Sequence, residues 1–177
     1  MVQTNVQGFS GDVQIRGTTF IKANSNTNNL AIGTEAGEIS QGTQAVAVGY
    51  QAGKTSQSGS SVAVGREAGM TSQGGYAIAV GWQAGETTQG NNATAVGRLA
   101  GQSNQGNSAT AVGDQAGKTT QGTHAVAVGY LAGQISQGIN TVAVGRLTGQ
   151  TSQGDDAIAV GNKAGRTSQG TFAVAVG

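Results

Sequence analysis

One glycine recurs every sixteen residues along most of this 177-residue chain, and this period constrains the fold more than any other feature. The ten members of the series are Gly33, Gly49, Gly65, Gly81, Gly97, Gly113, Gly129, Gly145, Gly161 and Gly177. A fixed short period indicates a solenoid or another repeat array, in which each repeat packs on its neighbours. Because nearly every residue of one repeat has copies in the others, such a chain is a poor place to look for a unique active site.

The other positions of the repeat hold almost as well. An alanine lies two residues before the recurring glycine, a second glycine four residues after it, and a glutamine eight residues after it. The consensus coil reads A-V-A-V-G-x-x-A-G-x-T-S-Q-G-x-x. Glycines four residues apart in every coil disfavour a helix, since each costs about 1 kcal/mol relative to alanine.

Each coil contains two segments with strand character. The run Ala45-Val46-Ala47-Val48 alternates valine with alanine and ends at Gly49, as short strands do. A turn bracketed by Gly49 and Gly53 leads to a second, more polar strand over residues 52–57. The sequence therefore predicts an all-β fold, a narrow β-solenoid of about nine coils stacked about 4.8 Å apart into a rod of roughly 40 Å.

The strand alternation places valines on one face and alanines on the other. We expect Val46, Val48, Ala52 and Thr55 to supply the core, which is thin for a stable monomer. The flat alanine face is then suited to close packing against another chain, and the prediction is an oligomer; the alternative is a very narrow single roll in which alanine simply fits. The predicted oligomer face consists of Ala47, Ala63, Ala79, Ala95 and Ala111.

Two regions divide the chain. Residues 1–29 do not follow the period, and the alternating stretch 12–23 indicates an N-terminal segment that caps the first coil or attaches the rod to something larger. Residues 30–177 form the repeat region, which stops partway into a tenth coil without an atypical capping repeat, as expected of a fragment.

Composition excludes several classes of protein. A net charge of +1 with 10% charged residues gives no electrostatic case for nucleic acid, and the absence of cysteine excludes disulfides and thiolate metal sites. No apolar run approaches a membrane span of about 18 residues, so membrane insertion is not expected. Residues 1–9 lack the basic and apolar parts of a secretion signal, which favours assembly in the cytoplasm or a fragment of a longer chain.

The strand motifs resemble a known family. Ala45–Gly49, Ser61–Gly65, Ala125–Gly129 and Leu30–Gly33 resemble the S-V-A-I-G motif of YadA-like heads, the head domains of trimeric autotransporter adhesins. The resemblance covers residues 30–177 and implies a left-handed parallel β-roll, a homotrimer and a role in adhesion at the cell surface. The usual adhesin repeat is shorter and less uniform, and nothing here resembles a coiled-coil stalk or a membrane anchor.

A longer unit points to a different carrier. The segment V-G-Y-Q-A-G-x-x-x-Q-G, beginning at Val48 and nearly repeated from Val128, is similar to repeats in fibre proteins predicted for large DNA viruses and phages. This favours an extracellular or virion-surface fibre that projects from a virion or phage, with a bacterial adhesin head as the alternative. The expected partners are further copies of the same chain and a host-surface glycan or protein.

The position after the recurring glycine carries large side chains. Stacking would bring Trp82 within cation–π distance of Arg66 and Arg98, and Arg98 within reach of Asp114. Aromatic rings beside arginines can bind sugars or anionic groups; the alternative is a solvated, variable turn. The predicted receptor-facing stripe consists of Tyr50, Arg66, Trp82, Arg98, Tyr130 and Arg146.

Two further columns are polar. Stacked glutamines can hydrogen-bond from coil to coil, so we expect a structural ladder of Gln57, Gln73, Gln89, Gln105 and Gln121. The threonine column that includes Thr55 suggests a function of another class, ice binding, although Ile39, Ser103 and Ile135 interrupt it.

No catalytic, cofactor or metal site is predicted, and the chain is not expected to be an enzyme. The segment 49–55 resembles a phosphate-binding loop but has three residues between its glycines where four are needed. His124 is the only histidine, which rules out the usual zinc and triad arrangements within one chain, and Asp155 and Asp156 are typical of a turn.

Overall fold

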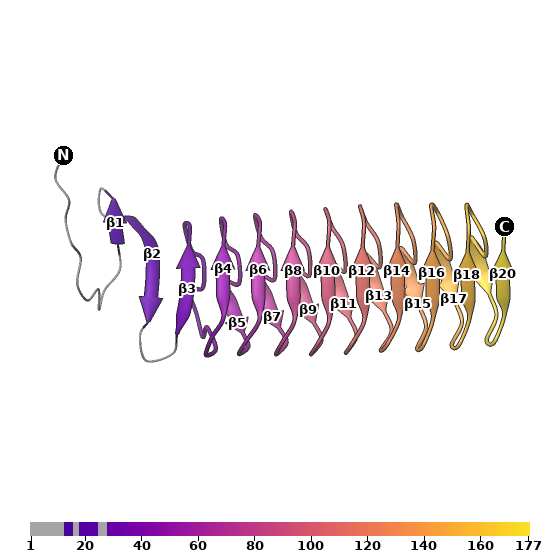
Figure 1. Ribbon diagram of the computed structural model, residues 1–177, viewed down its shortest axis with the longest axis horizontal. Coiled ribbons are helices and arrows are strands. Elements are labelled where there is room, and N and C mark those ends of the chain that lie inside the picture. The colour runs from indigo at the N-terminus through magenta and orange to yellow at the C-terminus, as the bar shows by residue number, and fades with distance from the viewer. Residues whose placement is uncertain (1–12, 16–17, 25–27) are drawn as a thin grey trace.

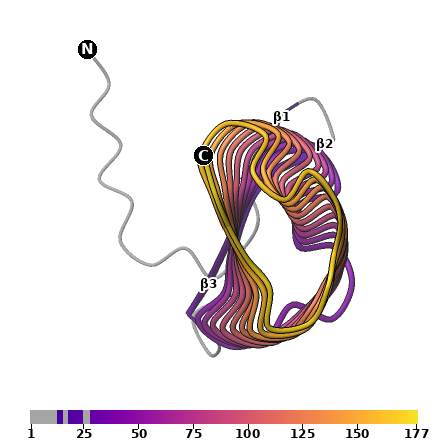
Figure 2. The same cartoon turned by 90° about the vertical axis from the view of Figure 1, so that its right-hand side faces the viewer.

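The computed structural model describes the backbone of residues 13–15, 18–24 and 28–177, and the side chains of residues 28–177. It is an all-β rod in which one thin coil follows another from end to end (Figure 1). Viewed along its axis, the rod is a stack of flattened rings with the coils superposed (Figure 2). The predicted parallel β-solenoid of about nine coils with a sixteen-residue spacing is confirmed.

Two sheets run along the rod, and each of the eight coils between residues 46 and 169 contributes one strand to each sheet. The strands of the first sheet are β1 (Val13–Ile15), β2 (Thr18–Asn24), β3 (Asn29–Ile32), β4 (Val46–Val48), β6 (Val62–Val64), β8 (Ile78–Val80), β10 (Thr94–Val96), β12 (Thr110–Val112), β14 (Val126–Val128), β16 (Val142–Val144), β18 (Ile158–Val160) and β20 (Val174–Val176). The strands of the second sheet are β5 (Thr55–Gln57), β7 (Thr71–Gln73), β9 (Thr87–Gln89), β11 (Ser103–Gln105), β13 (Thr119–Gln121), β15 (Ile135–Gln137), β17 (Thr151–Gln153) and β19 (Thr167–Gln169).

From β3 onward every pairing is parallel and keeps one register. Ala95 of β10 lies opposite Ala79 of β8 and Ala111 of β12, so each residue stacks on the residue sixteen positions away. The second sheet repeats this register, with Gln105 opposite Gln89 and Gln121. Its strands are shorter than predicted, because residues 52 and 53 belong to the turn and β5 begins only at Thr55.

The turns depend on backbone conformations that glycine adopts readily. Gly49 has φ of +129°, and a Cβ built on it would lie 2.5 Å from the carbonyl oxygen of Gly65 in the next coil. Gly53, at φ +51°, closes the same turn. The columns of Gln51, Ser56 and Ser60 also have positive φ, which the sequence did not reveal because these residues are not glycine.

The interior is lined by alanine, and the predicted orientation of the first strand is wrong. The predicted oligomer face, Ala47, Ala63, Ala79, Ala95 and Ala111, is fully buried within the single chain. A Cβ on Gly133 would lie 3.1 Å from the Cβ of Ala127, so little space is left beside the alanine methyl groups. The valines therefore point outward, and alanine fits the narrow interior of the roll.

The other predicted core residues divide in the same way. Ala52 is fully buried, as expected, and its column forms one core cluster with the column of Ala47. Thr55 is only half-buried on the outside of the second sheet. Gln57, by contrast, is 1% exposed, so its amide belongs to the core.

The N-terminal strands extend the first sheet in the antiparallel sense. β2 pairs with β3, with Lys22 opposite Ala31, and β1 pairs with β2. β2 therefore occupies the edge of the first coil, the position predicted for a cap. Residues 1–12, 16–17 and 25–27 of the predicted N-terminal segment lie outside the described residues, and attachment to something larger stays a prediction.

Candidate binding surface

Three arginines stack on aromatic rings along one turn of the coil. The guanidinium carbon of Arg98 lies 5.8 Å from the centre of the Trp82 ring, one coil away, which confirms the predicted cation–π contact. Arg66 lies 5.8 Å from the ring centre of Tyr50, rather than beside Trp82 as expected. Arg146 lies 5.7 Å from the ring centre of Tyr130. The six residues of the predicted stripe are thus brought together as three pairs, each joining two neighbouring coils.

Carboxylates balance the charge of two of these arginines. Arg98 forms an ion pair of 2.9 Å with Asp114, as predicted, and Arg66 forms one of 3.0 Å with Glu67. Within residues 28–177 no such partner is found for Arg146. The stripe therefore differs electrostatically along its length, although its stacking geometry repeats.

The aromatic rings of the stripe are about half-exposed. Tyr50, Trp82 and Tyr130 are 44%, 42% and 45% exposed. One arginine covers part of each ring, so the remaining ring surface and the donors of the guanidinium are what the stripe offers to a ligand.

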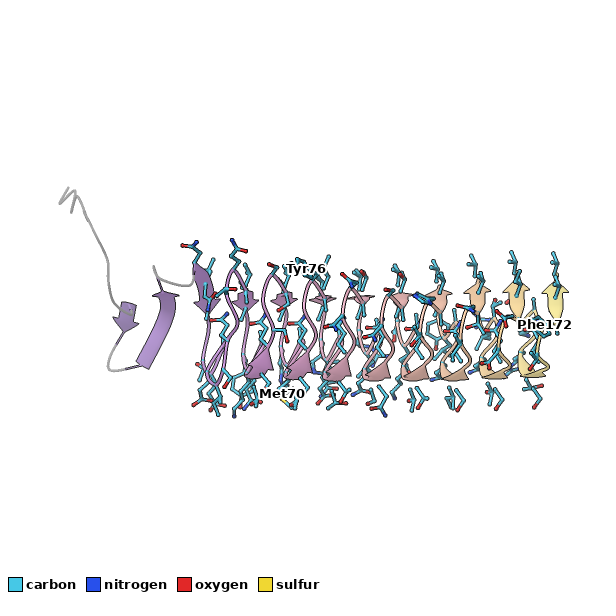
Figure 3. All side chains as sticks on the ribbon, turned by 90° about the horizontal axis from the view of Figure 1, so that it is seen from below. Met70, Tyr76 and Phe172 are labelled. Atoms are coloured by element: carbon cyan, nitrogen blue, oxygen red, sulfur yellow. The ribbon has the colours of Figure 1, made fainter. Side chains whose placement is uncertain are left out.

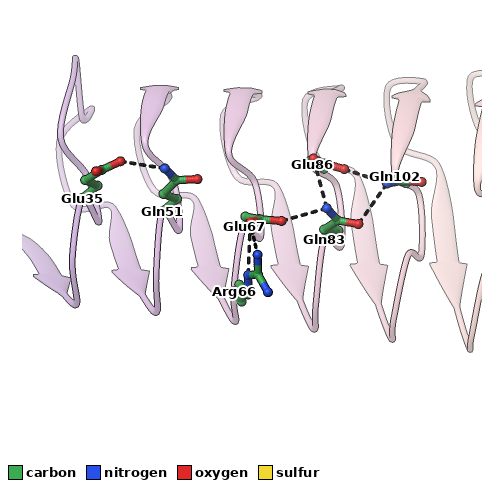
Figure 4. Close-up of polar contacts among 7 residues, drawn as sticks. All are labelled: Glu35, Gln51, Arg66, Glu67, Gln83, Glu86 and Gln102. Atoms are coloured by element: carbon green, nitrogen blue, oxygen red, sulfur yellow. Dashed lines mark hydrogen bonds and ion pairs between the residues drawn. The ribbon is translucent and has the colours of Figure 1, made fainter.

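Beside the stripe lies a polar network that the sequence reasoning missed. Gln83 donates to Glu67 at 2.7 Å, and Gln102 donates to Glu86 at 2.7 Å (Figure 4). In the preceding coils Gln51 and Lys54 both donate to Glu35, at 2.7 and 2.5 Å. The alternation of Glu and Gln at residues 35, 51, 67 and 83 was the signal that could have revealed it.

The network perturbs two ionisable groups. The hydrogen bond from the Lys54 ammonium lowers the pKa of Glu35, and the hydrogen bond from Gln51 acts in the same direction. The same contact raises the pKa of Lys54. Because Glu35 with its lowered pKa stabilises the fold only when ionised, its contribution is present at neutral pH and is lost as the pH falls through that pKa.

The glutamine column forms a hydrogen-bonded ladder inside the rod. The amides of Gln73, Gln89 and Gln105 each donate to the next glutamine at 3.1 Å. Each also donates to a strand carbonyl, as Gln105 does to Thr94 at 2.9 Å. The predicted ladder is confirmed from Gln73 to Gln121, whereas Gln57 is joined to Gln41 instead.

The outer face of the first sheet carries two apolar columns. One consists of Leu30, Val46, Val62, Ile78, Thr94, Thr110, Val126, Val142, Ile158 and Val174, and the other of Ile32, Val48, Val64, Val80, Val96, Val112, Val128, Val144, Val160 and Val176. These side chains are half-buried to exposed, with Ile78 and Val160 each 39% exposed. We call this surface the valine face.

Side chains project from both sides of the rod in Figure 3, as Tyr76 and Met70 do on opposite sides.

The outer face of the second sheet carries hydroxyl groups in two neighbouring columns. Thr55, Thr71 and Thr87 stack in register, and Ser56, Ser72 and Thr88 lie next to them. Ile39 and Ile135, 51% and 42% exposed, interrupt the first column.

The remaining candidates lie in turns. His124 is exposed at φ +59°. Asp155 accepts a hydrogen bond from the backbone N–H of Ile139 at 2.8 Å, and Asp156 accepts one from Asn140 at 3.0 Å. Among the described residues no three His, Cys, Asp or Glu side chains are grouped so that they could hold a metal ion. That same part of the chain contains no helix long and apolar enough to cross a membrane.

Comparisons with protein-family models, with curated proteins and with solved structures gave no match for this chain.

Proposed function

We propose that this chain is a structural rod, a homotrimer that forms part of a surface fibre projecting from a virion or phage and presents a receptor-facing stripe. A bacterial trimeric adhesin head is the alternative carrier. The observation that carries the proposal is the unbroken parallel register from β3 to β20, which makes the molecule an extended and uniform column. The proposal includes a left-handed winding of the coils, which is implied by the resemblance of the strand motifs to YadA-like heads.

The mechanism of such a rod is mechanical. Every coil is bonded to the next through both sheets and through the turns between them, as in the 2.8 Å bond from the N–H of Gly97 to the carbonyl of Val80. Bending the column would break several of these bonds together, so the coils stiffen one another. The length of the rod is then set by the number of repeats, which suits a part that holds a binding surface away from its base.

The valine face supports self-association. It extends over ten strands, about 45 Å by the spacing of a parallel ladder. Two residues across, its area is on the order of 300 Å² or more, the size of the largest exposed apolar patch on a typical monomer, which is often functional. Three such faces packed around one axis would bury the valines. This contact replaces the packing of alanine faces that was expected from the sequence.

The mass in solution tests this association. We expect light scattering to give the mass of three chains for the wild type and of one chain for V80K/V96K/V112K, which places three charges on the valine face. T87K/S103K/T119K, which adds the same charges to the outside of the second sheet, should keep the mass of three chains. A wild type with the mass of a single chain would overturn the trimer.

The proposal includes no catalytic step, cofactor, nucleic acid or membrane insertion. The described carboxylates near the stripe are engaged by Lys54, Arg66, Arg98 or glutamine amides, rather than held in pairs that could exchange a proton.

Ice binding is a second candidate function, favoured by one observation. The second sheet presents two adjacent, uncharged hydroxyl columns in parallel register instead of the single file expected from the sequence. An ice-growth assay on the wild-type rod tests it, and growth unchanged from that in buffer would exclude this function.

A further inference from the structure

The cations of the repeat region fall into two groups. Lys54, Arg66 and Arg98, in the earlier coils, each form an ion pair, with Glu35, Glu67 and Asp114. The later cations are Lys118, Arg146, Lys163 and Arg166, and within residues 28–177 none of them has a carboxylate within ion-pair distance. Positive charge is therefore locally neutralised toward the N-terminal coils and uncompensated toward the C-terminal ones.

Three of the unpaired cations lie in two neighbouring coils, and one of them stacks on an aromatic ring. Arg146 stacks on Tyr130 at 5.7 Å, and the backbone N–H of Lys163 donates to the carbonyl of Arg146 at 2.9 Å. Arg166 lies in the same coil as Lys163, with its Nε donating to Gln150 at 3.0 Å. All three cations are exposed. We call Tyr130, Arg146, Lys163 and Arg166 the basic patch.

The nearest acidic residues along the chain belong to a different turn of the coil. Asp155 and Asp156 precede β18, whereas Lys163 and Arg166 follow it. Both aspartates are also engaged by the coil before, through Ile139 and Asn140. The basic patch thus presents donors to solvent without an acidic group among them.

We propose that the basic patch binds an acidic polysaccharide, a chain of sugars bearing carboxylate or sulfate groups. The guanidinium groups of Arg146 and Arg166 offer planar, bidentate donors that match those anions, and Lys163 adds a point charge. Tyr130, 45% exposed, supplies an apolar ring surface beside the charges, against which a sugar ring packs. This inference deepens the receptor-facing role and rests on the proposed function for the display of the rod at a surface.

The arrangement favours a sugar polymer over nucleic acid. The patch offers three charges within two neighbouring coils, about 5 Å apart along the rod. Nucleic acid binding depends on many phosphate contacts, and the chain as a whole carries a net charge of only +1.

The test measures binding of immobilised heparin and hyaluronate, as sulfated and carboxylated probes, with neutral dextran as a control. R146Q/K163Q/R166Q should lower the affinity for an acidic probe by about tenfold or more, since three exposed charge contacts are lost together. K54Q/R66Q/R98Q removes the same charge from the paired group and should lower it far less. Binding by the wild type to only one acidic probe identifies which anion the patch accepts.

Tyr130 has its own matched control. Tyr50 stacks on Arg66 with nearly the same geometry and exposure but outside the basic patch. We expect Y130A to weaken binding of the acidic probes several-fold and Y50A to weaken it far less, with circular dichroism reporting that both variants fold.

Several outcomes would overturn the proposal: no binding of either acidic probe, equal loss in the two charge triples, or binding of duplex DNA as tight as that of heparin. The last would show a general polyanion surface. The mass measurement is independent of these assays, so a monomer that binds heparin contradicts the trimer alone, and a trimer that binds neither probe contradicts the basic patch alone.

Discussion

At the scale of single residues, the turn glycines differ in how strongly they are required. Gly97 has φ of +128°, and a Cβ there would lie 2.5 Å from the carbonyl oxygen of Gly113. Gly75 lacks positive φ, and a Cβ there would meet nothing closer than 3.7 Å. Gly97 belongs to the recurring glycine series, whereas the position of Gly75 carries Asn91 and Asn107 in the next two coils, so only the first glycine occupies a place that no other residue fits.

We therefore predict opposite effects of the same substitution at these positions. Gly97→Ala should destabilise the rod by about 2–4 kcal/mol, because it combines backbone strain with a contact that the next coil cannot relieve. Gly75→Ala should be neutral or stabilise it by up to about 1 kcal/mol, since alanine restricts the unfolded chain. Chemical denaturation followed by circular dichroism measures both, and equal stabilities of the two variants would contradict the argument.

At the scale of the strands, the glutamine ladder ties the two sheets together from inside. Gln89 is 2% exposed and donates both to Ile78 of the first sheet and to Gln105 of the next coil. A surface counterpart exists in Gln134 and Gln150, which are joined by a bond of 3.0 Å but only half-buried. Solvent can replace the second kind of bond but not the first.

Replacing the buried amides should cost far more than replacing the surface ones. We predict that Q89L/Q105L/Q121L lowers the melting temperature by at least about 10 °C, since each substitution leaves buried polar groups without a partner. Q102L/Q134L/Q150L, with the same change of side chain on the surface, should lower it by no more than a few degrees. If the two triple variants have the same melting temperature, the glutamine ladder does not contribute to the stability of the rod.

The strands also show what the sequence could predict and what it could not. The period, the parallel stacking, the glycine turns and the contact of Trp82 with Arg98 follow from spacing, because a fixed repeat places identical positions one coil apart. The orientation of the strand does not follow, since both alternating residues are apolar and either could face inward. Ala47 faces inward because the narrow interior of the coil fits its small side chain. Arg66 stacks on Tyr50 rather than on Trp82 because of its side-chain rotamer, which the repeat spacing does not determine.

At the scale of the whole molecule, the rod is a sum of equal steps. Each coil contacts the coil before it and the coil after it, through strands that pair only with their sixteen-residue neighbours. Stability of such an array is close to a sum of the coils and of the interfaces between them. The fold therefore depends more strongly on the length of each repeat, sixteen residues, than on the number of repeats.

Two deletions of nearly equal length should separate the effect of repeat length from that of repeat number. Removing residues 114–129, one complete coil, joins Gly113 to Tyr130 and keeps every buried column in place, so we predict a folded rod with a slightly lower melting temperature. Removing residues 114–128 instead leaves Gly129 as one extra residue at the junction, so the coils before and after it meet one position out of register, with valines opposite alanines. We expect that variant to have a clearly lower melting temperature than the first, because the coils on the two sides of the junction no longer stack. Equal melting temperatures of the two variants would mean that the register between neighbouring coils is not what holds the rod together.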